Sequence, residues 1–176
     1  KSAQAAEQFM LVAKQDGVSA DIQREALWTA ASLYEESGKV NDARSSWTHY
    51  IELFPQPVTE AIEVRQRLVK LGKQSGDSTD VRKWQQAIVD ADAAAGSQRN
   101  DRTKTLAAEA MLELAEPRRA AFSSVRLKAP LEQSLKLKKS LMEEALAAYN
   151  RAAGYGMAAV TTAATYRIAE IYQQLS

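Results

Sequence analysis

The chain of 176 residues carries 23 Lys and Arg against 22 Asp and Glu, and it has no cysteine. The balanced charge excludes an overall field that would draw the chain onto nucleic acid or an anionic membrane, and the missing cysteines exclude disulfides, thiolate nucleophiles and cysteine-based metal sites. Helix-favouring residues dominate while Gly numbers seven and Pro four, so the composition predicts an all-α fold.

The chain starts directly in helical periodicity, and residues 2–15 are predicted to form a helix. Ala5, Phe9 and Val12 recur at helical spacing within it. Because the chain begins at Lys1 rather than at Met, we also expect it to be a piece of a longer protein, with any targeting segment lying upstream.

Residues 24–57 predict two antiparallel helices joined by a short turn. The small side chains of Ala31 and Ala43 would let the two helices approach closely. Tyr34 and Trp47 would fill the volume beside that contact. Small residues set against large rings therefore define a helical hairpin.

The ends of the two helices carry their own signals. Gly38 would end the first helix at a residue with positive φ, and Pro55 would stop the second. The segment resembles one 34-residue unit of the tetratricopeptide repeat (TPR) family, whose signature positions are filled by Leu27, Ala30, Ala31, Tyr34, Ala43, Trp47, Tyr50 and Pro55. Tyr50 departs from the usual alanine, so a wider local spacing is expected.

The resemblance implies a solenoid of stacked hairpins, with residues 1–176 forming a single TPR-like domain. Residues 2–17 resemble the second helix of a partial repeat, because Ala5, Phe9 and Val12 have the family's spacing. Residues 159–176 resemble the first helix of another partial repeat, since their central part aligns without gaps with the first helix of the unit 24–57.

Residues 58–96 resemble a degenerate repeat with a longer turn. A helix is predicted over 59–74, with one apolar stripe formed by Ala61, Val64, Leu68 and Leu71. After the turn-rich segment 72–79, a second helix is predicted from Asp80 to about residue 95, with Trp84 and Ala87 at the family's spacing.

Residues 99–156 predict an enlarged hairpin. Its first helix meets Pro117, which should kink or restart it because an interior proline removes a backbone donor and clashes one turn back. The apolar pattern then continues to Pro130. A second long helix is predicted over 131–153, where Ala145, Tyr149 and Ala152 recover the family's spacing and Gly154 and Gly156 follow.

The C-terminal half also resembles large TPR proteins of Gram-negative bacteria that are thought to act in the cell envelope. The segments that carry this resemblance are residues 91–96, 99–102, 114–117 and 161–170. It implies a periplasmic or cell-envelope location, with the cytoplasm as the alternative.

The TPR resemblance also implies a concave groove lined by set positions of the first helices. These positions are Glu25, Trp28, Ser32 and Glu35 in the unit 24–57, and Ala163, Tyr166, Glu170 and Gln173 in the last helix. Trp28 and Tyr166 would either grip a partner or pack against neighbouring units. Glu25 and Glu35 would repel a C-terminal carboxylate, so a neutral or basic ligand is expected.

A second candidate surface is basic. Between residues 118 and 139 the only acid is Glu132, against Arg118, Arg119, Arg126, Lys128, Lys136, Lys138 and Lys139. This stripe would be either a solvated face or a binding surface for an acidic protein, a phospholipid head group or nucleic acid. Nucleic acid is disfavoured because Phe122 is the single aromatic residue of this stretch, so aromatics are not interleaved with the cations for base stacking.

Few residues suit catalysis or cofactor binding. His49 is the only histidine and is predicted to be a solvated surface residue, so we expect no enzyme, metal or cofactor site. No apolar run approaches the roughly 18 residues of a membrane-spanning helix. The sequence thus favours a non-catalytic scaffold that binds a peptide or partner helix in its groove. The alternative is a protein that binds nucleic acid or an anionic surface through residues 118–139. The identity of the partner and the oligomeric state stay open.

Overall fold

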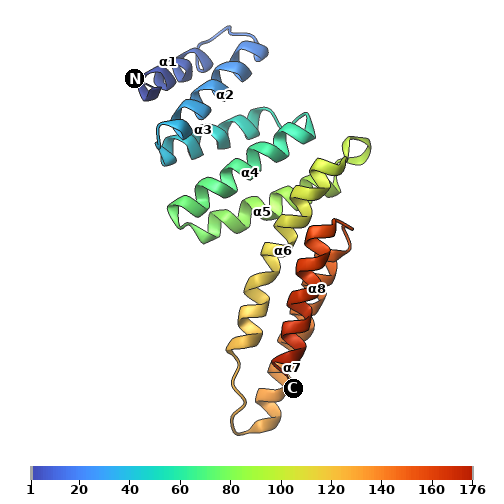
Figure 1. The fold of residues 1–176 in the computed structure, drawn as a ribbon. Helices are drawn as coiled ribbons and strands as arrows, with labels where there is room; N and C mark the ends of the chain where they lie inside the picture. Colours follow the sequence, from blue (N-terminus) through green and yellow to red (C-terminus); the bar gives the residue numbers. More distant parts are fainter. Residues whose placement is uncertain (1, 176) are drawn as a thin grey trace. The chain divides into compact units, whose positions relative to one another are not determined.

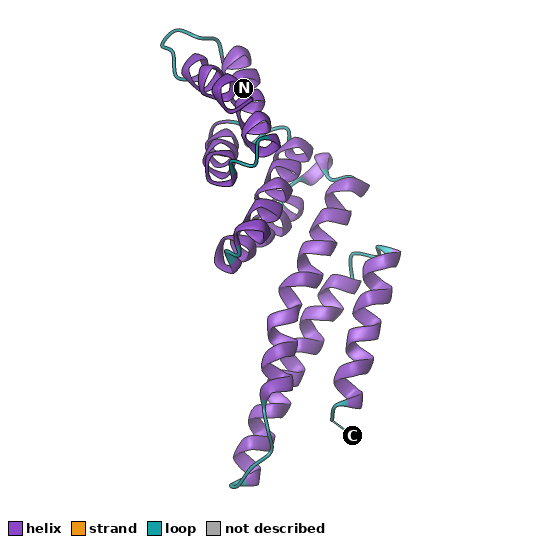
Figure 2. Ribbon diagram, turned by 60° about the vertical axis from the view of Figure 1, so that its left-hand side comes forward, coloured by secondary structure: helices purple, strands orange, loops and turns teal. Residues whose placement is uncertain are grey.

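The computed structural model describes residues 2–175, which form helices and no strand (Figures 1 and 2). The all-α prediction is confirmed for these residues. The elements in chain order are α1 (Ser2–Ala13), α2 (Ala20–Glu36), α3 (Val40–Leu53), α4 (Val58–Ser75), α5 (Ser78–Ala93), the 3-10 helix η1 (Gly96–Gln98), α6 (Asp101–Ser124), α7 (Leu131–Ala153) and α8 (Ala158–Gln173).

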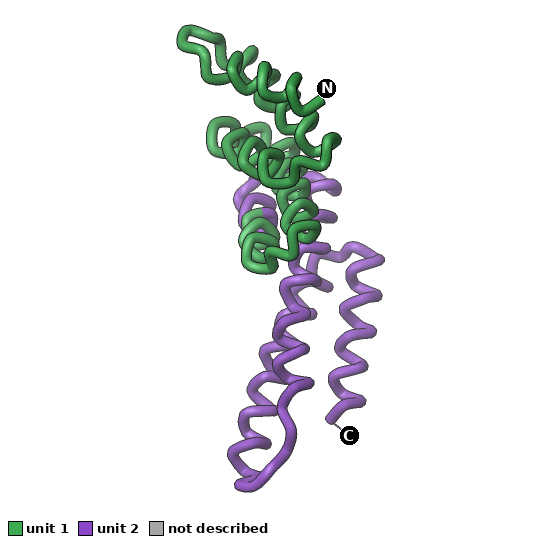
Figure 3. Tube along the Cα trace, turned by 90° about the vertical axis from the view of Figure 1, so that its left-hand side faces the viewer, with its two compact units in different colours: residues 1–87 green, residues 88–176 purple. Residues whose placement is uncertain are grey.

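The chain divides into two compact units, Lys1–Ala87 and Ile88–Ser176 (Figure 3). The division falls inside α5, within the segment 58–96 that the sequence analysis treats as one repeat. Unit 1 therefore contains α1 to α4 and the start of α5, and unit 2 contains the remainder.

In unit 1, α2 and α3 form the helical hairpin predicted for residues 24–57. Ala31 and Ala43 are fully buried, as the close-approach argument requires. Gly38 has φ of 71° in the turn, and α3 ends at Leu53 before Pro55. The positive φ and the proline stop are thus both confirmed.

The residues of α1 that face the rest of unit 1 are mostly small. Phe9 and Val12 are exposed, whereas Ala6 and Ala13 are buried against the rest of unit 1. Small side chains, not large ones, therefore make the close contact between α1 and α2. Met10 lies on the buried side and accepts a hydrogen bond from the Ser46 hydroxyl of α3.

Helix α4 buries the predicted apolar stripe, since Ala61, Val64, Leu68 and Leu71 are all fully buried. The helix ends at Gly76, which adopts the left-handed conformation with φ of 73°. Gly72 lies so close to α5 that an added Cβ would meet the Val81 side chain at 2.9 Å. Helices α4 and the start of α5 therefore approach through a glycine.

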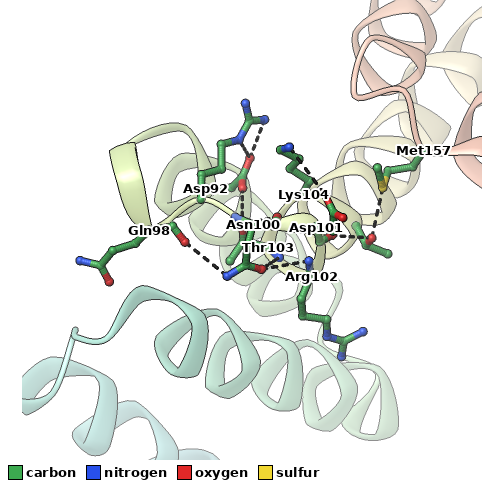
Figure 4. Close-up of polar contacts among 10 residues, drawn as sticks. Asp92, Gln98, Asn100, Asp101, Arg102, Thr103, Lys104 and Met157 are labelled. Atoms are coloured by element: carbon green, nitrogen blue, oxygen red, sulfur yellow. Dashed lines mark hydrogen bonds and ion pairs between the residues drawn. The ribbon is translucent and has the colours of Figure 1, made fainter.

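In unit 2, a polar cluster fixes the start of α6 (Figure 4). The Asn100 side chain accepts hydrogen bonds from the backbone N–H groups of Arg102 and Thr103, and the Thr103 hydroxyl accepts one from the Asn100 N–H, which completes a capping box. Thr103 also donates to the buried carboxylate of Asp92 at 2.7 Å, and Arg99 donates to the same carboxylate at 2.9 Å. Arg99 and Thr103 together compensate the buried charge.

Of the two outcomes expected at Pro117, a kink or a restart of the helix, the restart does not occur. The helix is continuous from Asp101 to Ser124 and ends well before Pro130. Pro117 lies on the exposed side of the helix, where the loss of one backbone donor costs least because water reaches the backbone.

Helices α6, α7 and α8 pack against one another in unit 2. Helix α7 buries Ala145, Tyr149 and Ala152 completely. Ala164 and Ile171 of α8 are also fully buried, so the third helix closes the apolar core of this unit.

Ala43→Leu should destabilise unit 1 by about 2 kcal/mol, because a larger side chain at a fully buried contact forces neighbouring side chains off their rotamers. Ser45→Leu, on the exposed face of the same helix, should change stability by less than about 0.5 kcal/mol. All three tryptophans lie in unit 1, so urea unfolding followed by tryptophan fluorescence measures this unit. Equal stability of the two variants would contradict the close approach of α2 and α3.

Candidate protein-binding site

Trp28 of α2 lies at the centre of an aromatic cluster in unit 1. Its ring meets Trp47 edge-on at a centroid distance of 4.9 Å and Tyr50 at 5.4 Å. Trp47 and Tyr50 come from α3 and are fully buried, whereas Trp28 is only half-buried. The cluster therefore presents part of one large ring to solvent on a rigid support.

A hydrogen-bonded triad lies beside these rings and joins α2, α3 and α4. Arg24 donates to the Tyr50 hydroxyl at 2.9 Å and to Glu60, and Tyr50 donates to the same carboxylate. The hydrogen bond to Glu60, and then the one to Tyr50, raises the pKa of Arg24. Burial alone would raise the pKa of Glu60, but the bonds from Tyr50 and Arg24 lower it, so the carboxylate is held ionised.

A second set of polar contacts joins α2 to α4. Glu35 accepts hydrogen bonds from the Trp47 indole N–H and from Arg67, both at 3.1 Å. The Arg67 guanidinium also lies 5.6 Å from the Trp28 ring centroid and 5.2 Å from that of Trp47, within range of a cation–π interaction. These contacts fix the orientation of both indole rings.

A hollow of about 240 Å³ opens beside Trp28. It is lined by Asp21, Arg24, Glu25, Trp28, Tyr50 and Glu60. Asp21 and Glu25 are exposed, and within residues 2–175 neither takes part in an ion pair. The hollow therefore combines an aromatic wall with two uncompensated carboxylates, which together suit a cationic side chain.

The predicted groove residues of α2 take different positions. Glu25 and Trp28 line the hollow, and Ser32 is half-buried. Glu35 is bound by Trp47 and Arg67, so its charge is compensated. The acidic character of this surface comes from Asp21 and Glu25 instead.

Two of the four predicted groove residues of α8 in unit 2, Tyr166 and Glu170, have defined surroundings. Tyr166 is 62% exposed, and the Arg167 guanidinium lies 5.9 Å from its ring centroid. Glu170 accepts a hydrogen bond from Arg167 at 2.8 Å and lies 3.9 Å from Arg119. Of the pair, Tyr166 is thus the side chain available for contact.

Sequence reasoning missed Asp21, Arg24, Glu60 and Arg67. Arg24 and Glu60 are separated by 36 residues, so no local pattern connects them. Asp21 could have been found, because it precedes Glu25 and Trp28 by four and seven residues, a spacing that places all three on one helix face.

The predicted basic stripe divides into bound and free side chains. Arg119 pairs with Glu116 at 2.9 Å, Arg118 donates to the Leu114 carbonyl, and Lys138 donates to the Val125 carbonyl. The remaining four cations are exposed and form no ion pair with another described residue: Arg126, Lys128, Lys136 and Lys139.

His49 is half-buried rather than fully solvated. It lines a hollow of about 590 Å³ between α1, α3 and α5 of unit 1, near Arg44. Arg44 is already bound by Asp77 at 3.0 Å and Asp80 at 2.8 Å. Within residues 2–175, no group of three or more His, Cys, Asp or Glu side chains could hold a metal ion, and no helix is long and apolar enough to cross a membrane.

Comparisons with protein-family models, with curated proteins and with solved structures find no match to this chain. A functional proposal for this chain therefore depends on its own residues and their geometry.

Tyr149→Phe should cost unit 2 about 1.5 kcal/mol at neutral pH, because the buried hydroxyl donates to the Glu116 carboxylate at 2.7 Å. Tyr166→Phe is the matched control, since Tyr166 is exposed and no hydrogen bond holds its hydroxyl among the described residues. Unit 2 has no tryptophan, so urea unfolding followed by circular dichroism is the measurement. Equal effects of the two changes would contradict a role for the Glu116 bond.

The stability difference between the Tyr149→Phe and Tyr166→Phe variants should depend on pH. Burial alone would raise the pKa of Glu116, but the bonds from Tyr149 and Arg119 lower it in the folded state. A lowered carboxyl pKa stabilises the fold above the unfolded value of about 4.3 and loses this effect as pH falls through the folded pKa. The deficit of Tyr149→Phe should therefore shrink in acid, and a constant deficit from pH 7 to strongly acidic pH would contradict this assignment.

Proposed function

We propose that the chain is a non-catalytic, TPR-type solenoid segment that binds a peptide or helix of another protein. The proposal for unit 1 is that the hollow beside Trp28 holds a Lys or Arg side chain of that partner. In unit 2, Tyr166 of α8 supplies a further aromatic contact. A periplasmic or cell-envelope location is part of the proposal and depends on the resemblance of the C-terminal half.

Contacts between alternate helices support the solenoid proposal. In unit 1, Met10 and Ser46 join α1 to α3, and Arg44 joins α3 to α5. Helices α2 and α4 are likewise joined by Arg24 and Glu60. Such contacts, in which each helix meets the next but one, are expected where hairpins stack in sequence.

The observation that carries the binding proposal is the pairing of Trp28 with two free carboxylates. The rings of Trp47 and Tyr50 hold Trp28 in place, so little side-chain entropy is lost when its exposed part is covered. Asp21 and Glu25 supply charge on the same helix face. An immobilised indole beside carboxylates fits a basic side chain, which stacks its methylene stem or guanidinium on the ring.

Selection from a random displayed peptide library tests this proposal with defined ligands. Binders should be enriched in Lys and Arg, and Trp28→Ala should weaken them about tenfold or more because buried aromatic contacts dominate such interfaces. The double change Asp21→Asn and Glu25→Gln should weaken them several-fold, with a smaller difference at high salt. Phe9→Ala removes an exposed aromatic elsewhere in unit 1 and should leave binding unchanged.

For unit 2, Tyr166→Ala should weaken those selected peptides that contact α8, whereas Tyr172→Ala, an equally exposed tyrosine of the same helix, should not. Circular dichroism would establish that all variants retain their helices. If no peptide is selected, or if binders retain full affinity for the Trp28 and Tyr166 variants, the groove proposal is wrong.

A further inference from the structure

Residues 125–139 form the end of the hairpin made by α6 and α7, and we name this segment the hairpin tip. Helix α6 stops at Ser124, so the connecting loop lies beside the first turns of α7. Ser134 of α7 holds this loop, accepting a bond from the Lys128 N–H at 3.2 Å and donating to the Lys128 carbonyl at 2.9 Å. Within unit 2, the tip extends beyond the last turn of α8 (Figures 1 and 2).

The hairpin tip exposes four leucines. The exposed fractions are 50% for Leu127, 59% for Leu131, 47% for Leu135 and 53% for Leu137. Single exposed leucines are common, but four within eleven residues form an apolar patch of the kind that marks an interaction site.

The same segment is strongly cationic. It contains five Lys and Arg and one acid, Glu132. Lys138 lies over the Phe122 ring at 5.1 Å, whereas the other four cations extend into solvent without an ion pair to any described residue. The apolar patch is therefore surrounded by positive charge.

The distribution of the leucines distinguishes between kinds of partner. A helix that binds in a protein groove presents its apolar residues on one stripe. At about 100° per residue, Leu131 and Leu135 lie on one side of α7, but Leu137 points about 120° away from Leu131, and Leu127 projects from the loop. Apolar contacts thus surround the tip, which suits entry into a fluid layer better than a fit to one groove.

We propose that the hairpin tip docks on the surface of an anionic lipid bilayer. Its leucines enter the boundary between head groups and acyl chains, while Arg126, Lys128, Lys136 and Lys139 meet the negative head groups. Nucleic acid would use the cations but not the leucines, and the tip has no aromatic side chain for base stacking. This activity is separate from peptide binding and uses other residues.

Co-sedimentation with lipid vesicles tests the docking of the whole chain. The chain should bind phosphatidylcholine vesicles that contain about one third phosphatidylserine, and bind pure phosphatidylcholine much more weakly. Each cation near an anionic surface contributes about fivefold, so Lys136→Gln with Lys139→Gln should lower the partition coefficient roughly 25-fold. Lys14→Gln with Lys39→Gln removes the same charge from exposed positions in unit 1 and should have little effect.

The leucines are tested at constant charge. Leu131→Ser with Leu135→Ser should lower the partition coefficient about tenfold or more, whereas Leu53→Ser, an exposed leucine of unit 1, should not. Circular dichroism checks the fold, and Leu127→Ser in the loop replaces the double variant if that variant loses helix.

Three results would overturn the proposal. The first is no binding of the parent chain to anionic vesicles. The second is vesicle binding that is unchanged by the leucine substitutions. The third is retention of single-stranded DNA or RNA that depends on Lys136 and Lys139 but not on the leucines, which would assign the tip to nucleic acid.

Discussion

Close contact between helices through alanine is the constraint on which both units depend. Ala31 and Ala43 in unit 1, and Ala145, Ala152 and Ala164 in unit 2, are all fully buried. Alanine loses no side-chain entropy on burial and lets two backbones approach, while a large ring beside it fills the remaining volume. This arrangement explains why the short side chains of α1, and not its phenylalanine, face the core.

Close approach has a polar consequence that recurs in both units. A buried tyrosine on one helix reaches a carboxylate on the neighbouring helix, and an arginine binds the same carboxylate: Tyr50, Glu60 and Arg24 in unit 1, and Tyr149, Glu116 and Arg119 in unit 2. Each set satisfies a hydroxyl that burial would otherwise leave without a partner. The polar contacts therefore fix helix orientation in places where alanine alone would allow sliding.

The sequence predicted the helices well where periodicity and end signals agree, as for the hairpin 24–57 with Gly38 and Pro55 and for the second helix of the hairpin 99–156. It could not decide between a kink and a restart at Pro117, because the cost of proline depends on whether water reaches that side of the helix. The candidate site was only half predictable. Trp28 and Glu25 follow from repeat spacing, but the neutralisation of Glu35 by Arg67 depends on a contact across 32 residues that no local pattern encodes.

Both proposed binding surfaces depend on which charged side chains are paired within the fold and which are free. Counted over the whole chain, the charges nearly cancel and point to no partner. Inside the fold, arginines 24, 67 and 119 bind carboxylates, whereas Asp21 and Glu25 beside Trp28 in unit 1, and four cations at the end of the hairpin in unit 2, form no ion pair with a described residue. A free charge keeps its full interaction energy for a ligand, whereas a bound one must first break a hydrogen bond. These two surfaces therefore suit ligands of opposite charge, although the chain as a whole is almost neutral.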